Sequence, residues 1–247
     1  MSRTLEQLNS DNDNVVNFYV NFFFKLIEER NEDLQKVLIK SFSKIMKIPN
    51  FTSVTEYTIM TRIKNYFISK ILGLVPGESQ HMVGHEIKAI TTNEGEFTLK
   101  FMSSVLQFLP FSIVNDIVLN LNELIINTKN DHIMLNVMLC LDVAFNTKKF
   151  SLETVENVLK TLLTRDSILI REDDSENAII VAYIKAVTQV LINMSRINII
   201  CAMGYIGNII SILGEFFSST DGFLKNTVFN CMTNIFNTLL NPKNIEA

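Results

Sequence analysis

The chain has 247 residues, of which 47% are hydrophobic and 19% are charged, and its formal net charge is −4. This composition excludes an intrinsically disordered chain, because it supplies enough apolar surface to bury a substantial core. Eight glycines and four prolines are too few for a β-sandwich or barrel, which needs a turn about every ten residues. Long helices joined by short loops are therefore expected.

The first half of the chain is predicted to form helical hairpins. We expect segment 14–30 to pair with segment 33–48, and segment 54–72 to pair with a shorter helix at 81–90. A further helix is expected over 96–109 and ends before Pro110, because proline does not continue a helix.

A repeat dominates the second half. The segment DHIMLNVMLCLDVAF, residues 131–145, is followed at intervals of 45 residues by ENAIIVAYIKAVTQV, 176–190, and DGFLKNTVFNCMTNI, 221–235. Apolar residues at helical spacing coincide in the three copies. The aligned columns are Met134/Ile179/Leu224, Met138/Tyr183/Val228, Leu139/Ile184/Phe229, Leu141/Ala186/Cys231 and Phe145/Val190/Ile235.

Each copy opens on an acidic residue: Asp131, Glu176 or Asp221. A carboxylate at this position can accept hydrogen bonds from free backbone amides and favours the positive end of the helix dipole, so each acid is expected to begin a helix. Partner helices are expected upstream at 111–125, at 151–164 with Ser151 as N-cap, and at 204–217. The repeating unit is thus a helical hairpin.

A two-helix unit of this length is typical of HEAT and armadillo proteins, whose repeats run to roughly 40–47 residues. Stacking stabilises such units, because each buried large apolar side chain contributes about 1.5–3 kcal/mol whereas helix propensities differ by tenths. We predict an all-α fold, a right-handed α-solenoid of about five repeats in one domain spanning 1–247. The repeats are placed at 14–48, 54–90, 96–146, 151–193 and 197–240.

Segment 197–213 has no charged residue and is nearly long enough to cross a bilayer. Polar residues such as Asn198 and Asn208 interrupt it, and no lysine-rich flank sets an orientation. We therefore expect a helix buried on most sides by its neighbours, and no membrane insertion.

Three cysteines, Cys140, Cys201 and Cys231, are odd in number and far apart. They favour buried, reduced thiols in a reducing compartment over a disulfide framework. The first residues contain no apolar run of the kind found in secretory signals, so we expect an intracellular protein.

The chain lacks the common nucleotide-binding, metalloprotease and nucleophile-elbow motifs. Together with a repeat fold, this favours a non-catalytic protein with no cofactor and no small-molecule substrate. His81 and His85 lie four residues apart, but two ligands do not complete a tetrahedral zinc shell, so no metal site is expected.

Four lysines, Lys36, Lys40, Lys44 and Lys47, are spaced by four, four and three residues and share one face of a helix. No acidic residue lies between them. The stripe is either an ordinary solvated face or a ridge that binds RNA phosphates or an acidic partner. We take it as the candidate RNA- or partner-binding site.

The order of segments EFTLKFMSSVLQFLP (96–110), FSIVNDIVLNLNELI (111–125) and LETVENVLKTLL (152–163) resembles the HEAT-repeat region of the ribosomal RNA-processing protein twelve family. The resemblance covers about residues 80–240. It implies a nucleolar and nuclear scaffold that binds pre-ribosomal proteins and ribosomal RNA. Such a scaffold supports small-subunit assembly, pre-ribosomal RNA processing and subunit export without catalysis.

An alternative is an importin-like or phosphatase-scaffold-like adaptor that binds protein segments in its concave face. Salt-sensitive binding to structured RNA would favour the first function. Capture of a peptide or a small GTPase, with indifference to RNA, would favour the second.

Overall fold

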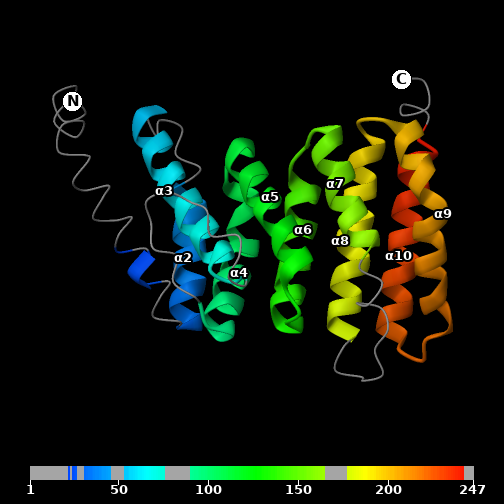
Figure 1. Ribbon diagram of the computed structural model, residues 1–247, viewed down its shortest axis with the longest axis horizontal. Coiled ribbons are helices and arrows are strands. Elements are labelled where there is room, and N and C mark those ends of the chain that lie inside the picture. The colour runs from blue at the N-terminus through cyan, green and yellow to red at the C-terminus, as the bar shows by residue number, and fades with distance from the viewer. Residues whose placement is uncertain are drawn as a thin grey trace. The chain divides into compact units, whose positions relative to one another are not determined.

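The computed structural model describes residues 22, 24–26, 31–45, 53–75, 90–164 and 177–241. From residue 31 onward the described residues form nine α-helices and two short 3₁₀ helices, residues 22 and 24–26 are also helical, and none of the described ranges contains a strand (Figure 1). The predicted all-α class is confirmed. The chain groups into two compact units, 1–117 and 118–247, which divide within helix α5. A single domain over the whole chain stays a prediction.

Unit 1 contains α2 (Glu32–Ile45), α3 (Ser53–Leu72), α4 (Thr92–Val105), the 3₁₀ helix η1 (Leu106–Phe108) and the start of α5 (Phe111–Asn127). Helices α2 and α3 begin within one residue of their predicted starts. Of the helix predicted at 81–90 only Ile90 is described, and it is not helical. Segment 14–30, apart from residues 22 and 24–26, lies outside the described residues.

Helix α4 begins at Thr92, four residues before the predicted start. Its N-cap is Thr91, whose hydroxyl accepts a hydrogen bond from the Glu94 backbone amide at 3.4 Å. The first turn is polar, so the apolar pattern alone could not reveal it. The helix ends in η1, and Leu109 is extended before Pro110, as expected for a residue that precedes proline.

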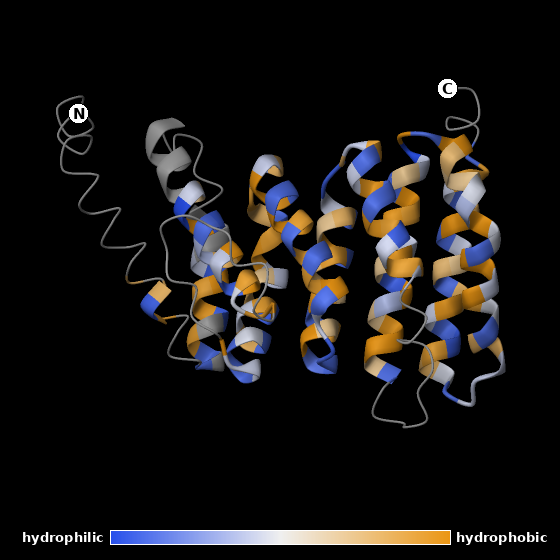
Figure 2. Cartoon of the chain, in the orientation of Figure 1, coloured by the Kyte–Doolittle hydropathy of each residue, from blue (hydrophilic) through white to orange (hydrophobic). Residues whose placement is uncertain are grey.

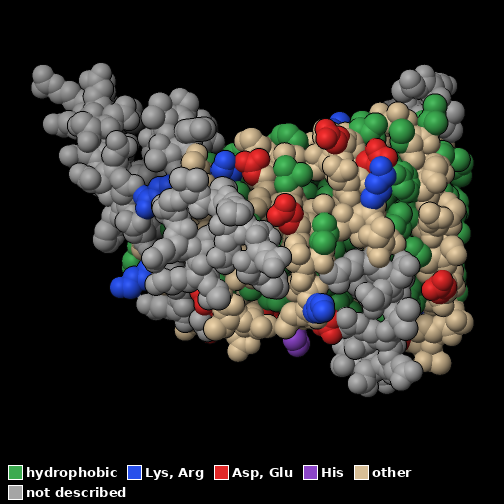
Figure 3. All heavy atoms as spheres, viewed as in Figure 1, with side chains coloured by type: hydrophobic (Ala, Val, Ile, Leu, Met, Phe, Trp, Pro, Cys, Tyr) green, Lys and Arg blue, Asp and Glu red, His purple; other side chains and the backbone are tan. Residues whose placement is uncertain are grey.

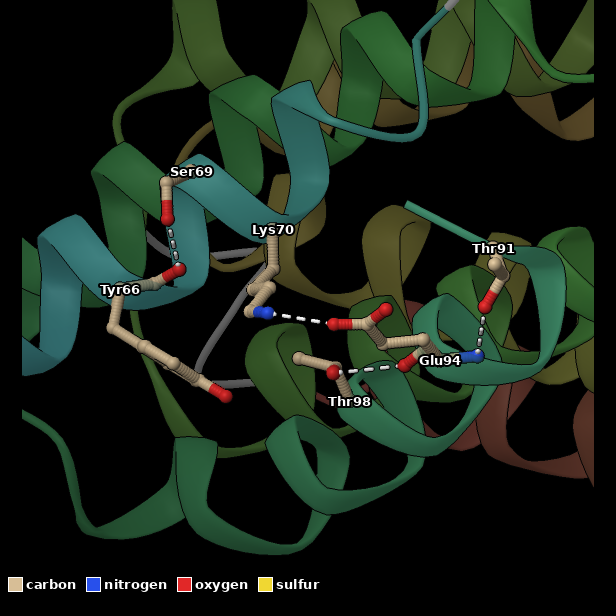
Figure 4. Close-up of polar contacts among 6 residues, drawn as sticks. All are labelled: Tyr66, Ser69, Lys70, Thr91, Glu94 and Thr98. Atoms are coloured by element: carbon tan, nitrogen blue, oxygen red, sulfur yellow. Dashed lines mark hydrogen bonds and ion pairs between the residues drawn. The ribbon is translucent and has the colours of Figure 1, made fainter. Parts of the chain in front are cut away.

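An ion pair joins α3 to α4 inside unit 1. The Lys70 ammonium lies 2.8 Å from a carboxylate oxygen of Glu94, and both side chains are largely shielded from solvent (Figure 4). Lys70 also lies 5.5 Å from the centre of the Tyr66 ring. Phe67 of α3 and Phe101 of α4 are fully buried, and their ring centres lie 6.3 Å apart. Polar and apolar contacts therefore fix the same helix pair.

Unit 2 contains the rest of α5, α6 (Asp131–Thr147), α7 (Leu152–Leu163), α8 (Asn177–Ser195), α9 (Ile199–Glu215), the 3₁₀ helix η4 (Phe216–Ser218) and α10 (Gly222–Leu239). Helix α8 is central, because it packs against α6, α7, α9 and α10 (Figure 1). Its two closest partners are α6 and α10, the other two copies of the repeated segment.

Four of the five predicted columns are buried in all three copies. Every member of the columns that begin at Met134, Met138, Leu141 and Phe145 is at most 5% exposed. The fifth column differs, because Ile184 is buried whereas Phe229 is 63% exposed. Helix α10 therefore has a narrower buried face than α8, which has helices on more sides.

The cap predictions have mixed outcomes. Ser151 and Asp221 are N-caps: Ser151 accepts from the Thr154 amide, and Asp221 accepts from the amides of the first turn of α10. Asp131 is not a cap, because the Asn130 side chain accepts from the Ile133 amide and Asp131 is the first helical residue. Asn and Asp cap helices equally well, so the sequence did not distinguish them. Glu176 and the segment 165–176 lie outside the described residues.

Buried asparagine bonds hold α8 in register with its neighbours. The Asn193 amide donates to the carbonyl oxygens of Phe145 at 2.9 Å and Lys148 at 2.6 Å. Its own oxygen accepts from the Phe150 amide at 3.3 Å. At the other end of α8, Asn177 donates to the carboxylate of Asp221 at 2.8 Å.

The prediction for segment 197–213 is wrong in one respect. Only Ala202, Ile209 and Leu213 of helix α9 are buried, and Ile200 is 81% exposed. Hydrophobic residues recur around α9 and α10, and some reach the surface of this unit (Figures 2 and 3). Helices 177–195 and 199–218 are long and apolar enough to cross a membrane, but the first has 83% of its apolar window buried inside the protein and the second only 17%. The absence of charged residues in this segment predicted that the helix would be buried on most sides. Helix α9 instead contacts its neighbours along a single stripe.

We expect Asn193→Ala to lower the free energy of unfolding by about 2–4 kcal/mol, because it leaves buried backbone groups without partners. Chemical denaturation monitored by circular dichroism would measure this. Asn208→Ala, at an exposed position on α9, is the control and should change stability by less than about 0.5 kcal/mol. Equal effects of the two substitutions would contradict the assigned role of Asn193.

Candidate functional site

The predicted lysine stripe lies on α2 and continues beyond it. Lys36 and Lys40 are exposed on this helix, whose C-terminal turn includes the backbone of Lys44. The Lys44 side chain and all of Lys47 lie outside the described residues. The grouping of all four ammonium groups therefore stays a prediction.

An acidic residue missed by the sequence analysis lies next to the stripe. The Lys36 ammonium is 3.2 Å from the Asp33 carboxylate one turn earlier, and both side chains are exposed. Exposed pairs of this kind contribute little to stability and exchange readily with other ions. Asp33 lowers the positive charge at the start of the stripe without closing it to an anion.

A polar groove in unit 2 is a second candidate site. It has a volume of about 360 Å³ and runs between α6, α8 and α10, the three copies of the repeat. Nine of its eleven lining residues are polar or charged. The lining comprises Asp142 and Asn146 of α6, Lys185, Thr188 and Gln189 of α8, and Phe223, Asn226, Thr227, Asn230, Cys231 and Asn234 of α10.

Five carboxamides dominate this lining, and we call them the amide set: Asn146, Gln189, Asn226, Asn230 and Asn234. None forms a side-chain hydrogen bond with another residue in the part of the chain that the structure describes. Asn193 differs sharply, since it is buried and makes three such bonds. The amide set therefore keeps its donors and acceptors available to solvent or a ligand.

Two charged residues of opposite sign face the groove. Burial raises the pKa of the Asp142 carboxyl above its usual range, and the charge of nearby Lys185 offsets this only in part. Lys185 is exposed, unlike most of α8. The groove thus has no net excess of either charge, and its carboxylate is poorly solvated.

A hydroxyl and a thiol lie at the base of the groove. Thr188 is 1% exposed, and its hydroxyl lies beside the Cys231 thiol. Burial raises the pKa of the Cys231 thiol, and the neighbouring Thr188 hydroxyl offsets this only in part. A buried thiol with a raised pKa is a poor nucleophile at neutral pH. This arrangement suits binding better than covalent catalysis.

The cysteines and histidines considered in the sequence do not form a further site among the described residues. Cys140 and Cys231 are buried as expected, but Cys201 is partly exposed. His81 and His85 lie outside the described residues, and the residues that the structure does describe contain no group of three or more potential metal ligands.

The sequence contains a signal for the groove that an analysis of apolar columns does not use. Asn226, Asn230 and Asn234 follow one another at intervals of four residues, so they must share a face of any helix over this segment. Only the packing of α10 beside α8 shows that this face meets Gln189 and Lys185.

Comparisons with known proteins do not assign a family. No family model and no curated protein matches the chain. Among solved structures, one engineered protein is 14% identical with a TM-score of 0.45, over 87% of this chain and 47% of its own. A second engineered protein is 12% identical with a TM-score of 0.38, over 89% of this chain and 97% of its own. The chain spans about half the length of the first, and neither likeness bears on function.

Asp142→Asn should raise the melting temperature at neutral pH, by about 1–3 °C at most, because it removes a carboxylate that burial penalises. The pKa of Asp142 is higher in the folded state, so folding disfavours its ionised form. The wild-type protein therefore loses stability as the pH rises from the unfolded-state pKa of this carboxyl to its folded-state pKa. The difference in melting temperature between Asp142→Asn and the wild type should therefore become smaller as the pH falls towards 4. Thermal unfolding at several pH values would measure it.

Asp131→Asn provides the comparison on the same helix. An acid in the first turn is favourable, so its loss should not raise the melting temperature. A uniform benefit from removing either acid would indicate general charge repulsion instead of local burial.

Proposed function

We propose that this chain is a non-catalytic scaffold of HEAT-type repeats that acts in assembly of the small ribosomal subunit. The observation that supports a repeat scaffold is the burial of equivalent residues, 45 positions apart, in α6, α8 and α10. Each of these helices covers apolar residues of the next. A right-handed α-solenoid of about five such units accounts for this pattern.

The ribosomal role is supported by the sequence resemblance to the ribosomal RNA-processing protein twelve family. The segments that carry the resemblance coincide with α4 and η1, α5, and α7, in the same order along the chain. By this resemblance the protein resides in the nucleolus and nucleus, where it binds pre-ribosomal proteins and ribosomal RNA. It needs no cofactor and takes no small-molecule substrate.

RNA contact is assigned to the lysine stripe. The net charge of −4 makes general attraction to RNA unfavourable, so binding needs a local concentration of positive charge. Lys36 and Lys40 supply part of it on the exposed face of α2. The ion pair between Lys36 and Asp33 is exposed and contributes little to stability, so Lys36 can exchange it for a phosphate contact at a small cost in free energy.

The second candidate is an importin-like or phosphatase-scaffold-like adaptor. The amide set favours it, because a neutral polar groove suits a protein segment better than a phosphate backbone. Both candidates are binding scaffolds, and they differ in whether RNA is a ligand.

Isolation of the tagged chain from its own cells tests the ribosomal role. Precursor RNA of the small subunit, with its assembly proteins, should be enriched over mature ribosomal RNA. A tag expressed alone is the control. Recovery of import cargo or a phosphatase, without precursor RNA, would instead favour the adaptor.

Replacing Lys36, Lys40, Lys44 and Lys47 by Gln should weaken binding of structured RNA and flatten its salt dependence. Each lysine that contacts a phosphate accounts for about 0.7–0.9 of the slope of log affinity against log salt concentration. Fluorescence anisotropy at several salt concentrations would measure both quantities.

The matched control replaces Lys25, Lys129, Lys149 and Lys225, all exposed, by Gln. Both variants lose four positive charges and change the net charge from −4 to −8. Similar losses of affinity would show that overall charge matters and that the stripe is an ordinary solvated face.

A further inference from the structure

We infer that the groove between α6, α8 and α10 binds an extended segment of a partner polypeptide and recognises it through the peptide backbone. The inference rests on the proposed role of the chain as a binding scaffold, but it does not require the ribosomal assignment.

The chemistry of the amide set indicates the class of ligand. Each carboxamide offers one acceptor oxygen and a donor nitrogen, the same pair of functions that a peptide unit presents. Asn146, Asn226, Asn230 and Asn234 are exposed, and Gln189 is partly exposed. Because these side chains have no hydrogen bonds to other described residues, a ligand would displace only water from them.

The spacing of the amide set on α10 matches that of an extended chain. Successive members of Asn226, Asn230 and Asn234 are separated by four residues, which is a rise of about 6.0 Å along a helix. In an extended chain, backbone groups that point in one direction recur every two residues, or about 6.6–6.8 Å. A segment inclined by about 25° to the helix axis brings the two spacings into register.

The other lining residues suit the remainder of such a segment. Thr188 lines the base of the groove, but its hydroxyl is buried beside the Cys231 thiol, so recognition of the backbone rests on the amide set. Asp142 and Lys185 lie on neighbouring helices and can pair with ligand side chains of opposite sign. Phe223, 65% exposed, offers an apolar surface at the start of α10.

The lining argues against the other ligand classes. Nucleic-acid affinity depends mainly on neutralising phosphates, whereas this groove holds one lysine and one aspartate. Small-molecule sites enclose most of their ligand, whereas four of the five carboxamides that line this groove are exposed. A polypeptide backbone needs neither charge nor an enclosed apolar pocket.

The test begins with selection of peptides from a displayed library of random 12-residue sequences on the full chain. A selected peptide, labelled with fluorescein, then serves as the probe in anisotropy titrations. We expect the wild-type chain to yield peptides that bind saturably. Failure to select any such peptide would overturn the inference.

The triple variant Asn226→Ala, Asn230→Ala, Asn234→Ala should lower the affinity for the peptide probe by about tenfold or more. Each lost hydrogen bond corresponds to about two- to tenfold in affinity. Alanine favours helix, so α10 should remain folded, and circular dichroism would verify this. The matched control is Asn157→Ala, Asn208→Ala, Asn237→Ala, which removes three exposed amides outside the groove and should bind like the wild type.

Backbone recognition has its own readout. Replacing single peptide bonds of the probe by esters removes one N–H at a time, and affinity should fall at alternate positions along the probe. Losses confined to side-chain substitutions of the probe, with no effect of the esters, would overturn recognition through the backbone.

A single-stranded RNA of 12 nucleotides tests whether the groove binds nucleic acid instead of a peptide. Its binding should be unchanged by the triple variant. RNA binding that is lost in the triple variant, and competed by the peptide probe, would assign the groove to nucleic acid instead. Recovery of precursor ribosomal RNA by the tagged chain depends on neither titration, so the proposed function and this inference can fail separately.

Discussion

Helix α8 has almost no exposed surface, and the packing of unit 2 depends on its burial. Fifteen of its 19 residues are buried among α6, α7, α9 and α10. Each large apolar side chain buried in this way contributes about 1.5–3 kcal/mol, against a net stability of about 5–15 kcal/mol for an ordinary domain. The neighbouring helices are therefore required for α8 to be soluble, and α8 is required to align them.

The same constraint explains which parts of the fold the sequence could predict. The 45-residue columns identified α6, α8 and α10 because each copy buries an equivalent apolar stripe against its neighbours. Helix ends were less certain, because polar residues define them. Thr91 extends α4 beyond its apolar pattern, and Asn130, not Asp131, caps α6.

Absence of charge proved an unreliable indicator of burial. Helix α8 contains Lys185 and is buried, whereas α9 is uncharged until Glu215 and is exposed over much of its surface. Burial depends on the number of neighbouring helices, and that number is a tertiary property. Glycines at 204, 207 and 214 have open space around them, so they do not reflect close packing within this chain.

The candidate sites differ in the same way. The lysine stripe could be predicted from spacing on one helix, because its members belong to a single segment. The groove could not be predicted from the sequence, because its lining comes from three helices. Its lining residues lie up to 92 positions apart, from Asp142 to Asn234. Its amides carry a recognisable spacing on α10, but their partners on α6 and α8 depend on how the helices pack.

The buried bonds of Asn193 also make the two sides of α8 unequal. Positions 45 residues away hold Lys148 and Thr238, so this bonding pattern joins α8 to α6 and has no asparagine counterpart at α10. Helix α10 is linked to α8 through Asp221 at its first turn, and its later residues include the exposed Phe229 and Phe236. Local opening should therefore begin in the last turns of α10, where backbone amides would exchange with deuterium well before those of α8. Because the groove is lined in part by α10, anything that occupies it should slow this exchange.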